Sequence, residues 1–153
     1  MNARGFTEVV ERGESLIELI IAITIMGIAV VAITAGIGTG IAMSDIHRKQ
    51  STAGVVVRSY AESILAHVAA SSSAYTGCAT SYSAPGFVSP AGYSASITGI
   101  SYWKDSSRTF ASSCGTDEGV QRVSLRVSSS DGRSSESLDV IVRKPCRAGD
   151  PSC

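Results

Sequence analysis

The sequence predicts an α+β protein in which a long N-terminal helix, first membrane-spanning and then amphipathic, packs on a small antiparallel β-sheet. Two observations lead to this prediction. Residues 19–44 contain no charged side chain, and the C-terminal half alternates apolar and polar residues as half-buried strands do. We therefore expect a membrane helix over residues 14–44, its amphipathic continuation over 45–70, and a β-rich head over 71–153; the cysteines and a family resemblance, given below, imply that this head is disulfide-bonded and extracytoplasmic.

The charge-free run is long enough to cross a bilayer. As a helix, residues 19–44 would span about 39 Å, against a hydrocarbon core of about 30 Å. The run is longer than the apolar core of a cleaved secretory signal, so an ordinary single-pass anchor is the stronger competing interpretation. The glycines at positions 36, 38 and 40 predict either a stretch that bends or unwinds locally, or close packing against a neighbouring helix.

An acidic residue, Glu18, stands at the start of this run, and Glu14 lies one helical turn earlier. A carboxylate inside a membrane span costs about 2.5–3.5 kcal/mol on insertion scales, and such residues tend to have a partner. An ordinary anchor supplies no partner, although a glutamate this close to the end of the run can also reach the interface. Both interpretations stay open at this point.

The segment RGESLIEL, residues 12–19, resembles the processing site of type IV pilins and type II secretion pseudopilins. In that family a short polar leader ends in glycine. A prepilin peptidase cuts after this glycine and methylates the new N-terminus, and a glutamate follows four residues after the first mature residue. Gly13, Glu14 and Glu18 stand at these places. The resemblance therefore implies a leader over residues 1–13, cleavage between Gly13 and Glu14, and N-methylation of Glu14.

The resemblance also supplies a partner for Glu18. In the family's filaments the glutamate of one subunit pairs with the N-terminal amine of its neighbour, which makes both buried charges tolerable. Glu18 is thus expected to be an assembly contact. The family usually has phenylalanine where this chain has Glu14. A glutamate after the cleaved glycine, in a Gly-Glu-Ser or Gly-Glu-Thr form, is associated with actinobacterial members. It adds a second negative charge beside the amine, and this affects methylation and filament chemistry more than cleavage.

A second glycine, Gly5, begins a stretch that reads like the family's usual Gly-Phe-Thr site. A cut there would place Glu8 too early and would leave Glu11 and Arg12 where the apolar helix should start. We therefore favour Gly13. The lysine and arginine bias around the span does not settle its orientation, so the resemblance and the cysteines place the leader in the cytoplasm.

Residues 45–70 predict a helix that continues into water and packs by one face. Apolar residues recur at helical spacing and form one broad stripe. The stripe comprises Val56, Val57, Tyr60, Ala61, Ile64, Leu65 and Val68. His67 falls on this helix and is expected to be a solvated or capping residue rather than a metal ligand, whereas His47, beside Arg48 and Lys49, is expected to belong to an interfacial charge cluster.

The remaining sequence predicts a loop over residues 71–96 and then strands. Residues 97–104, 123–127 and 138–142 carry the strand pattern. Asp131-Gly132 lies between the last two and is a hairpin signal. Together they predict an antiparallel sheet of three or four strands.

The four cysteines, Cys78, Cys114, Cys146 and Cys153, all lie in the C-terminal half. An even number without a C-x-x-C pattern predicts two disulfides and an oxidising compartment; four free thiols are the alternative. We pair Cys78 with Cys114, and Cys146 with Cys153, while the two other connectivities stay open. Each bridge would stabilise a small serine-rich head by about 2–4 kcal/mol.

No catalytic motif and no metal-ligand spacing occurs, so we expect no enzyme, no cofactor and no metal. The leading hypothesis is a pilin-like structural subunit that assembles through its N-terminal helix, located in the cytoplasmic membrane and, after assembly, at the cell surface. Its expected partners are prepilin peptidase, other pilin or pseudopilin subunits and the membrane. A neutral chain predicts no nucleic acid contact. The alternative is a monomeric, membrane-anchored extracellular binding protein.

Overall fold

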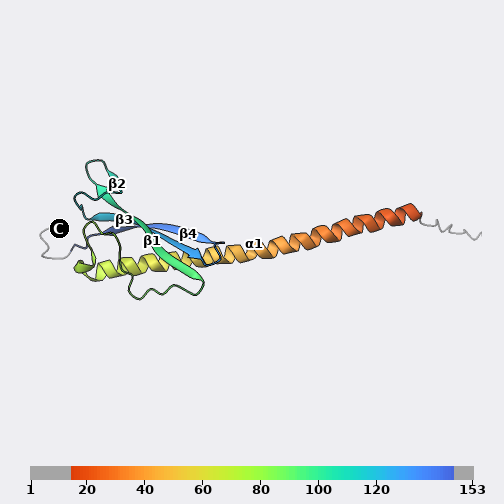
Figure 1. The fold of residues 1–153 in the computed structure, drawn as a ribbon, viewed down its shortest axis with the longest axis horizontal. Coiled ribbons are helices and arrows are strands. Elements are labelled where there is room, and N and C mark those ends of the chain that lie inside the picture. Colours follow the sequence, from red (N-terminus) through yellow and green to blue (C-terminus); the bar gives the residue numbers. More distant parts are fainter. Residues whose placement is uncertain (1–14, 147–153) are drawn as a thin grey trace, which may run out of the picture. The chain divides into compact units, whose positions relative to one another are not determined.

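The computed structural model describes residues 15–146 and contains one long helix and a four-stranded antiparallel sheet (Figure 1). The helix α1 spans Leu16–Ala70, and a short 3₁₀ turn, η1, follows at Ser72–Ala74. The strands are β1 (Tyr93–Lys104), β2 (Thr109–Ala111), β3 (Val120–Ser129) and β4 (Ser135–Arg143). The chain divides into two units after Met43, so that α1 contributes its first half to one unit and its second half to the other.

The second half of α1 packs on the sheet by one stripe, as the sequence predicts. The buried residues of this stripe are Ala53, Val56, Val57, Ala61, Ile64 and Val68. Tyr60 is half-buried and its ring lies 4.7 Å from that of Phe87, in the loop before β1. Leu65 was expected in the stripe, but it lies at the stripe's margin and is 37% exposed.

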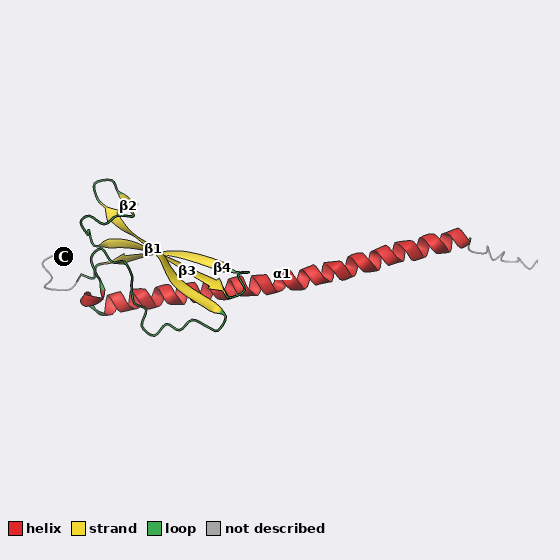
Figure 2. Cartoon of the chain, viewed as in Figure 1, coloured by secondary structure: helices red, strands yellow, loops and turns green. Residues whose placement is uncertain are grey.

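The sheet has the strand order β2-β1-β3-β4, with every pair antiparallel. Figure 2 shows the strands in yellow beside the C-terminal part of the red helix. The expected hairpin is confirmed, because the β3–β4 turn contains Asp131 and Gly132, and Gly132 has a positive φ of 70°. The expected loop over residues 71–96 is too long, since pairing with β3 already begins at Tyr93.

A β-bulge between Ile97 and Gly99 changes which residues of β1 face the helix. Before the bulge Tyr93, Ala95 and Ile97 pack against the core, and after it Ile100 joins them and Tyr102 is buried. An extra residue in one strand shifts the alternation of faces by one position. The next residue, Trp103, consequently lies on the face that points away from α1.

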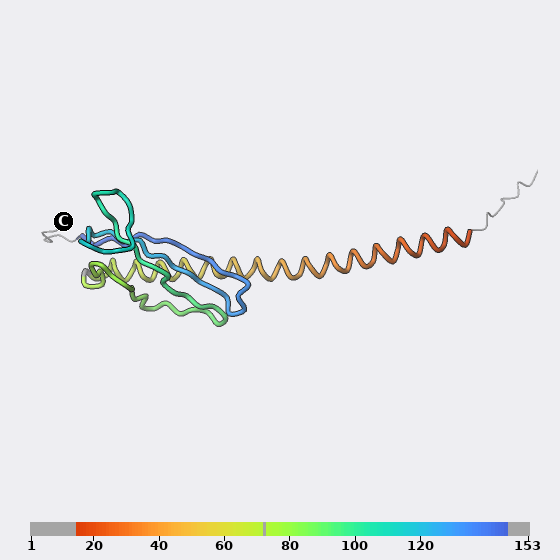
Figure 3. The backbone as a smooth tube through the Cα atoms, turned by 45° about the horizontal axis from the view of Figure 1, so that its top comes forward, coloured from red at the N-terminus to blue at the C-terminus, as the bar shows by residue number. Residues whose placement is uncertain are grey.

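The core lies between α1 and the inner face of the sheet. Val123, Leu125 and Val127 of β3 and Val142 of β4 are all 0% exposed. The loop that follows α1 covers one side of this core with Tyr75, Ala79 and Tyr82. Figure 3 shows this loop, in green, running back along the helix. The hydroxyl of Ser63 donates a hydrogen bond of 2.9 Å to the carbonyl of Pro85 and attaches the loop to the helix.

Adjacent residues of α1 provide a test of this packing. Ile64 is 0% exposed, whereas Leu65 is 37% exposed. We expect Ile64→Ala to lower the free energy of unfolding by about 2–5 kcal/mol, because it removes buried methyl groups and leaves a cavity. Leu65→Ala should cost clearly less. Urea unfolding of the full chain in detergent, followed by tryptophan fluorescence, measures both, and equal losses would contradict the described packing.

Candidate functional site

The N-terminal end of α1 carries the residues that the sequence singles out. Gly13 and Glu14 lie outside the described residues, so cleavage and methylation at this place stay predictions. Ser15 precedes the first helical residue, and its hydroxyl accepts a hydrogen bond of 3.3 Å from the backbone N–H of Glu18. Ser15 therefore caps the helix, and Glu18 is the third helical residue.

This cap was not among the features predicted from the sequence, although Ser15 and Glu18 have the spacing of a capping box, S-x-x-E. A carboxylate in the first turn is also favoured by the helix dipole. Among residues 15–146, no side chain forms a hydrogen bond or ion pair with the Glu18 carboxylate. The carboxylate thus keeps its full capacity to pair with a group from elsewhere.

The first half of α1 exposes apolar side chains on all sides. Its large hydrophobic residues from Leu16 to Met43 are between 53% and 76% exposed. The helix is long and apolar enough to cross a membrane. The hydroxyls of Thr24, Thr34 and Thr39 donate to carbonyls three or four residues earlier, so these polar groups are satisfied within the helix. This half is therefore compatible with lipid or with other apolar helices.

The glycine cluster at positions 36–40 does not interrupt the helix. Helical structure continues through Gly36, Gly38 and Gly40, so the expected local unwinding is not observed. A methyl group placed on any of the three would meet no atom within 4 Å. Their small size is thus not required by any contact among the described residues. Packing against a neighbouring helix stays a prediction.

A charged cluster joins the second half of α1 to the β3–β4 turn. Lys49 Nζ lies 2.8 Å from Asp45 Oδ2 and 2.6 Å from Asp131 Oδ2. These hydrogen bonds hold the pKa of Asp131 well below its usual range, lower that of Asp45, and raise that of Lys49. Asp131 Oδ1 also accepts hydrogen bonds from Ser129 Oγ and from the backbone N–H of Arg133. Asp131 therefore shapes the turn and fastens it to the helix.

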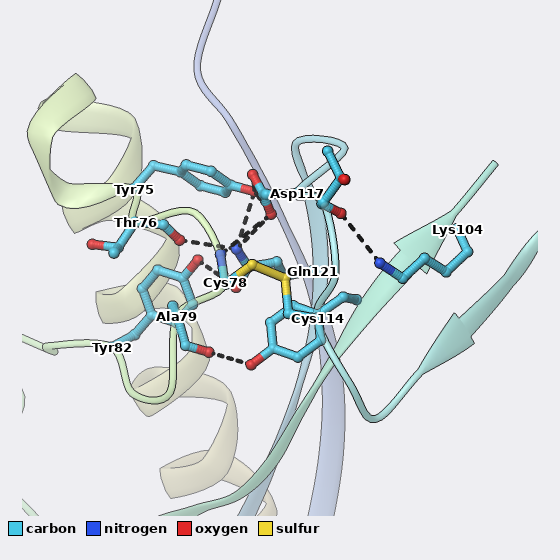
Figure 4. The surroundings of a disulfide bond; sticks show 11 residues. Tyr75, Thr76, Cys78, Ala79, Tyr82, Lys104, Cys114, Asp117 and Gln121 are labelled. Atoms are coloured by element: carbon cyan, nitrogen blue, oxygen red, sulfur yellow. Dashed lines mark hydrogen bonds between the residues drawn. A yellow bond between two sulfur atoms is a disulfide. The ribbon is translucent and has the colours of Figure 1, made fainter.

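A second polar cluster lies beside the disulfide, at the other end of the sheet (Figure 4). The bond between Cys78 and Cys114 confirms the expected pairing. Gln121 is 0% exposed, and its side-chain nitrogen lies 2.9 Å from the carbonyl of Thr76 and 3.1 Å from Asp117 Oδ1. Its side-chain oxygen accepts a hydrogen bond of 3.0 Å from the Tyr82 hydroxyl.

Tyr75 completes this cluster. Its hydroxyl donates to Asp117, with distances of 2.9 and 3.0 Å to the two carboxylate oxygens. Burial raises the pKa of Tyr75 and of Tyr82 far above the usual value, so both phenols stay neutral. The buried amide of Gln121 is thus fully paired, as a buried polar group must be to avoid a desolvation penalty. This cluster attaches the loop after α1 to β3.

Within residues 15–146 no group of three or more His, Cys, Asp or Glu side chains is placed to hold a metal ion. His47 and His67 lie apart on α1. The expected Cys146–Cys153 bond involves a residue outside the described range and stays a prediction. No family model, curated protein or solved structure is significantly similar to this chain.

The charged cluster at Lys49 predicts a dependence of stability on pH. The pKa of Asp131 is lower in the folded state than the value of about 3.9 in the unfolded state, so its contribution is present above about pH 4 and is lost as pH falls through the folded pKa. Asp131→Asn keeps the turn residues but removes the charge. We expect it to lower the melting temperature near neutral pH.

Thermal unfolding of the full chain in detergent, followed by circular dichroism between about pH 7 and pH 2, checks this expectation. The melting temperature of the variant should fall less on acidification than that of the unaltered chain. Asp139→Asn is the matched control, because Asp139 is exposed and lies 3.9 Å from its nearest cation, Arg122 Nε. A melting temperature near neutral pH that Asp131→Asn leaves unchanged would contradict a stabilising role for the cluster.

The disulfide predicts a second effect on stability. It closes a segment of 36 residues between the loop after α1 and the segment before β3. Replacing Cys78 and Cys114 together by alanine is expected to lower the free energy of unfolding by about 2–4 kcal/mol. The denaturant midpoint, measured in oxidising buffer by tryptophan fluorescence, reports this loss. Equal midpoints for the variant and the unaltered chain would show that the bridge contributes nothing to the fold.

Proposed function

We propose that this chain is a pilin-like structural subunit of a type IV pilus or a secretion pseudopilus. Prepilin peptidase cuts after Gly13 and methylates Glu14. The first half of α1 then holds the subunit in the cytoplasmic membrane until it packs against the same helix of other subunits in the filament. The resemblance of residues 12–19 to the family's processing site supports the cleavage step.

The observation that carries this proposal is the division of α1 by burial. From Leu16 to Met43 the helix is apolar and exposed, whereas Ala53–Val68 carries a stripe that is buried against the sheet. An exposed apolar helix of this length is costly in water and requires lipid or other apolar helices around it. A subunit that moves from membrane to filament meets these two environments in turn.

Glu18 has a defined role in this proposal. The carboxylate sits in the first turn of α1, and no side chain among residues 15–146 pairs with it. After cleavage the chain would begin with an ammonium group only four residues earlier. Pairing of this amine with Glu18 of a neighbouring subunit neutralises two charges that are each costly in an apolar environment. The pairing also favours one axial register between adjacent helices.

The head belongs outside the cytoplasm in this proposal. The Cys78–Cys114 disulfide fits an oxidising compartment, since such bonds are rare where thiols are kept reduced. The charges of Asp45, Arg48 and Lys49 directly follow the apolar half and suit the membrane–water boundary. The chain is therefore a single-pass membrane protein with a cytoplasmic leader before assembly.

The N-terminus of the protein from its native host tests the cleavage step. We expect peptide mass spectrometry to find a chain that begins at Glu14, with or without a methyl group on its amine. A chain that begins at Phe6 would assign the cut to Gly5. A start at Met1, or beyond Ala35, would contradict the pilin interpretation and would favour the anchored or secreted binding protein.

The assembly step is tested by Glu18→Ala. We expect normal cleavage but at least about a tenfold loss of the protein from sheared surface fibres, because the N-terminal amine then lacks its partner. Glu62→Ala is the matched control. Glu62 is an exposed residue of the same helix, and it lies in the half that packs on the sheet, outside the apolar half. If Glu18→Ala assembles as well as Glu62→Ala, the proposed pairing is wrong.

A further inference from the structure

The face of the sheet that points away from α1 is not uniform. Most of its residues are serine, threonine or charged: Ser94, Ser96, Thr98, Ser101, Arg122, Ser124, Arg126, Ser128, Ser135, Ser137, Asp139 and Arg143. Among residues 15–146, large apolar residues occur on this face only away from the β3–β4 turn: near the end of β1, in β2, at the start of β3 and near the end of β4. They are Trp103, Phe110, Val120 and Ile141.

These apolar residues surround a hollow, which we call the aromatic hollow. It has a volume of about 420 Å³ and is lined by Trp103, Phe110, Val120, Ile141 and Arg143. Binding sites for small groups commonly have volumes of about 300–1,000 Å³ and mostly apolar walls with a few polar groups. The rings of Trp103 and Phe110 meet edge to face at 5.2 Å, and Ile141 is 41% exposed.

The fold does not require this cluster. The hydrophobic core lies on the opposite face of the sheet. Replacing the apolar residues of the hollow would therefore remove no side chain from the core. Trp103 reaches the outer face only because the bulge after Ile97 shifts the alternation of β1. Trp103 and Phe110 are half-buried, and accessible aromatic residues beside arginine are characteristic of the central residues of protein interfaces.

The charges define what the hollow accepts. Arg122 is held over the Phe110 ring, with 4.8 Å from Cζ to the ring centroid, and donates to Ser101 Oγ. Arg126, further along the face, donates to Ser135 Oγ. The side chain of Arg143 forms no hydrogen bond or ion pair with any of residues 15–146. One wall of the aromatic hollow is therefore a cation without a partner among these residues, complementary to a single anion.

We propose that the aromatic hollow binds a peptide segment of a partner protein that presents an apolar side chain next to a carboxylate. The apolar side chain contacts Trp103, Phe110 and Ile141, and the carboxylate pairs with Arg143. β4 is an edge strand, and no strand among residues 15–146 pairs with its outer edge, so an extended segment can reach the hollow along this edge of the sheet. A polyanion is disfavoured, because Arg122 and Arg126 have partners on the protein and Asp139 stands between them.

This inference goes beyond the proposed function, and its test requires neither cleavage nor filament assembly. Trp103 is the single tryptophan of the chain, so its fluorescence reports directly on the hollow. The full chain in nanodiscs is titrated with the peptide acetyl-Glu-Ile-Phe-Asp-Glu-amide, which contains neither tryptophan nor tyrosine. The charge-reversed peptide acetyl-Lys-Ile-Phe-Lys-Lys-amide is the matched control. We expect a saturable change with the acidic peptide alone.

Variants of the chain locate the site. Arg143→Glu should weaken binding of the acidic peptide at least about tenfold, because it replaces attraction by repulsion. Ile141→Ser should weaken it without changing the preference for negative charge. Arg126→Glu is the control on the same face, outside the hollow, and should bind as the unaltered chain does. Equal melting temperatures establish that the variants are folded.

Four outcomes would overturn the proposal. The first is equal binding of both peptides, and the second is binding that Arg143→Glu leaves unchanged. The third is the absence of a fluorescence change with the acidic peptide, whether or not a thymidine oligonucleotide, titrated in place of the peptide, changes the fluorescence. In the fourth, the fluorescence depends on protein concentration without any peptide, and Ile141→Ser abolishes this dependence. A second copy of the chain would then occupy the hollow.

Discussion

The packing of one helical stripe against the inner face of the sheet is the interaction on which the rest of the structure depends. In proteins most helical stability comes from tertiary packing rather than from propensity, and a small sheet cannot bury its apolar face alone. Ile64 and Val68 of α1 meet Val123 and Leu125 of β3 in one continuous core. Because this contact uses only the second half of the helix, the first half is left with apolar side chains and no partner among the described residues.

The same packing explains where the polar clusters lie. Lys49 and Asp131 join the helix to the turn at one end of the sheet, and Tyr75, Asp117 and Gln121 join the following loop to β3 at the other end. Each cluster stands where the apolar contact stops. A thin core gives little orientational restraint at its ends, so directional hydrogen bonds and the disulfide there restrict the sheet and loop to one arrangement.

Much of this fold could be predicted from periodicity. A period near 3.6 predicted the buried stripe of α1, and alternation predicted β3 and β4 with the turn at Asp131-Gly132. The start of β1 at Tyr93 was missed because the segment before Ile97 is rich in serine and alanine and its composition predicted a loop, although Tyr93, Ala95 and Ile97 alternate with serines. The bulge at Thr98 was not predictable either. A one-residue insertion can be recognised only by comparison with the partner strand. The hydrogen bond that the Thr98 hydroxyl donates to the carbonyl of Ser124 is likewise a contact between strands.

The candidate site was predictable to a different degree. The resemblance singled out Glu18 but gave no account of the helix start, whereas the structure adds the Ser15 cap. The distant partners of Lys49 and Gln121 could not be predicted, because Asp131 and Tyr82 each lie more than 35 residues away along the chain. Sequence spacing reveals contacts within an element, but it carries no information on which polar groups from distant elements meet.

Two roles of Glu18 are compatible, and their combination limits what the residue can be exchanged for. As the third residue of α1, a carboxylate is favoured by the exposed N–H groups and the positive end of the helix dipole. That interaction requires no second subunit, so it stabilises the helix start in the monomer. Pairing with an amine of a neighbouring chain would use the same carboxylate, which takes no part in the cap, because Ser15 accepts its hydrogen bond from the backbone N–H of Glu18. Glutamine would preserve hydrogen bonding at the helix start but would not neutralise an ammonium group. The two roles are therefore separable, because helix content reports the first and filament assembly reports the second.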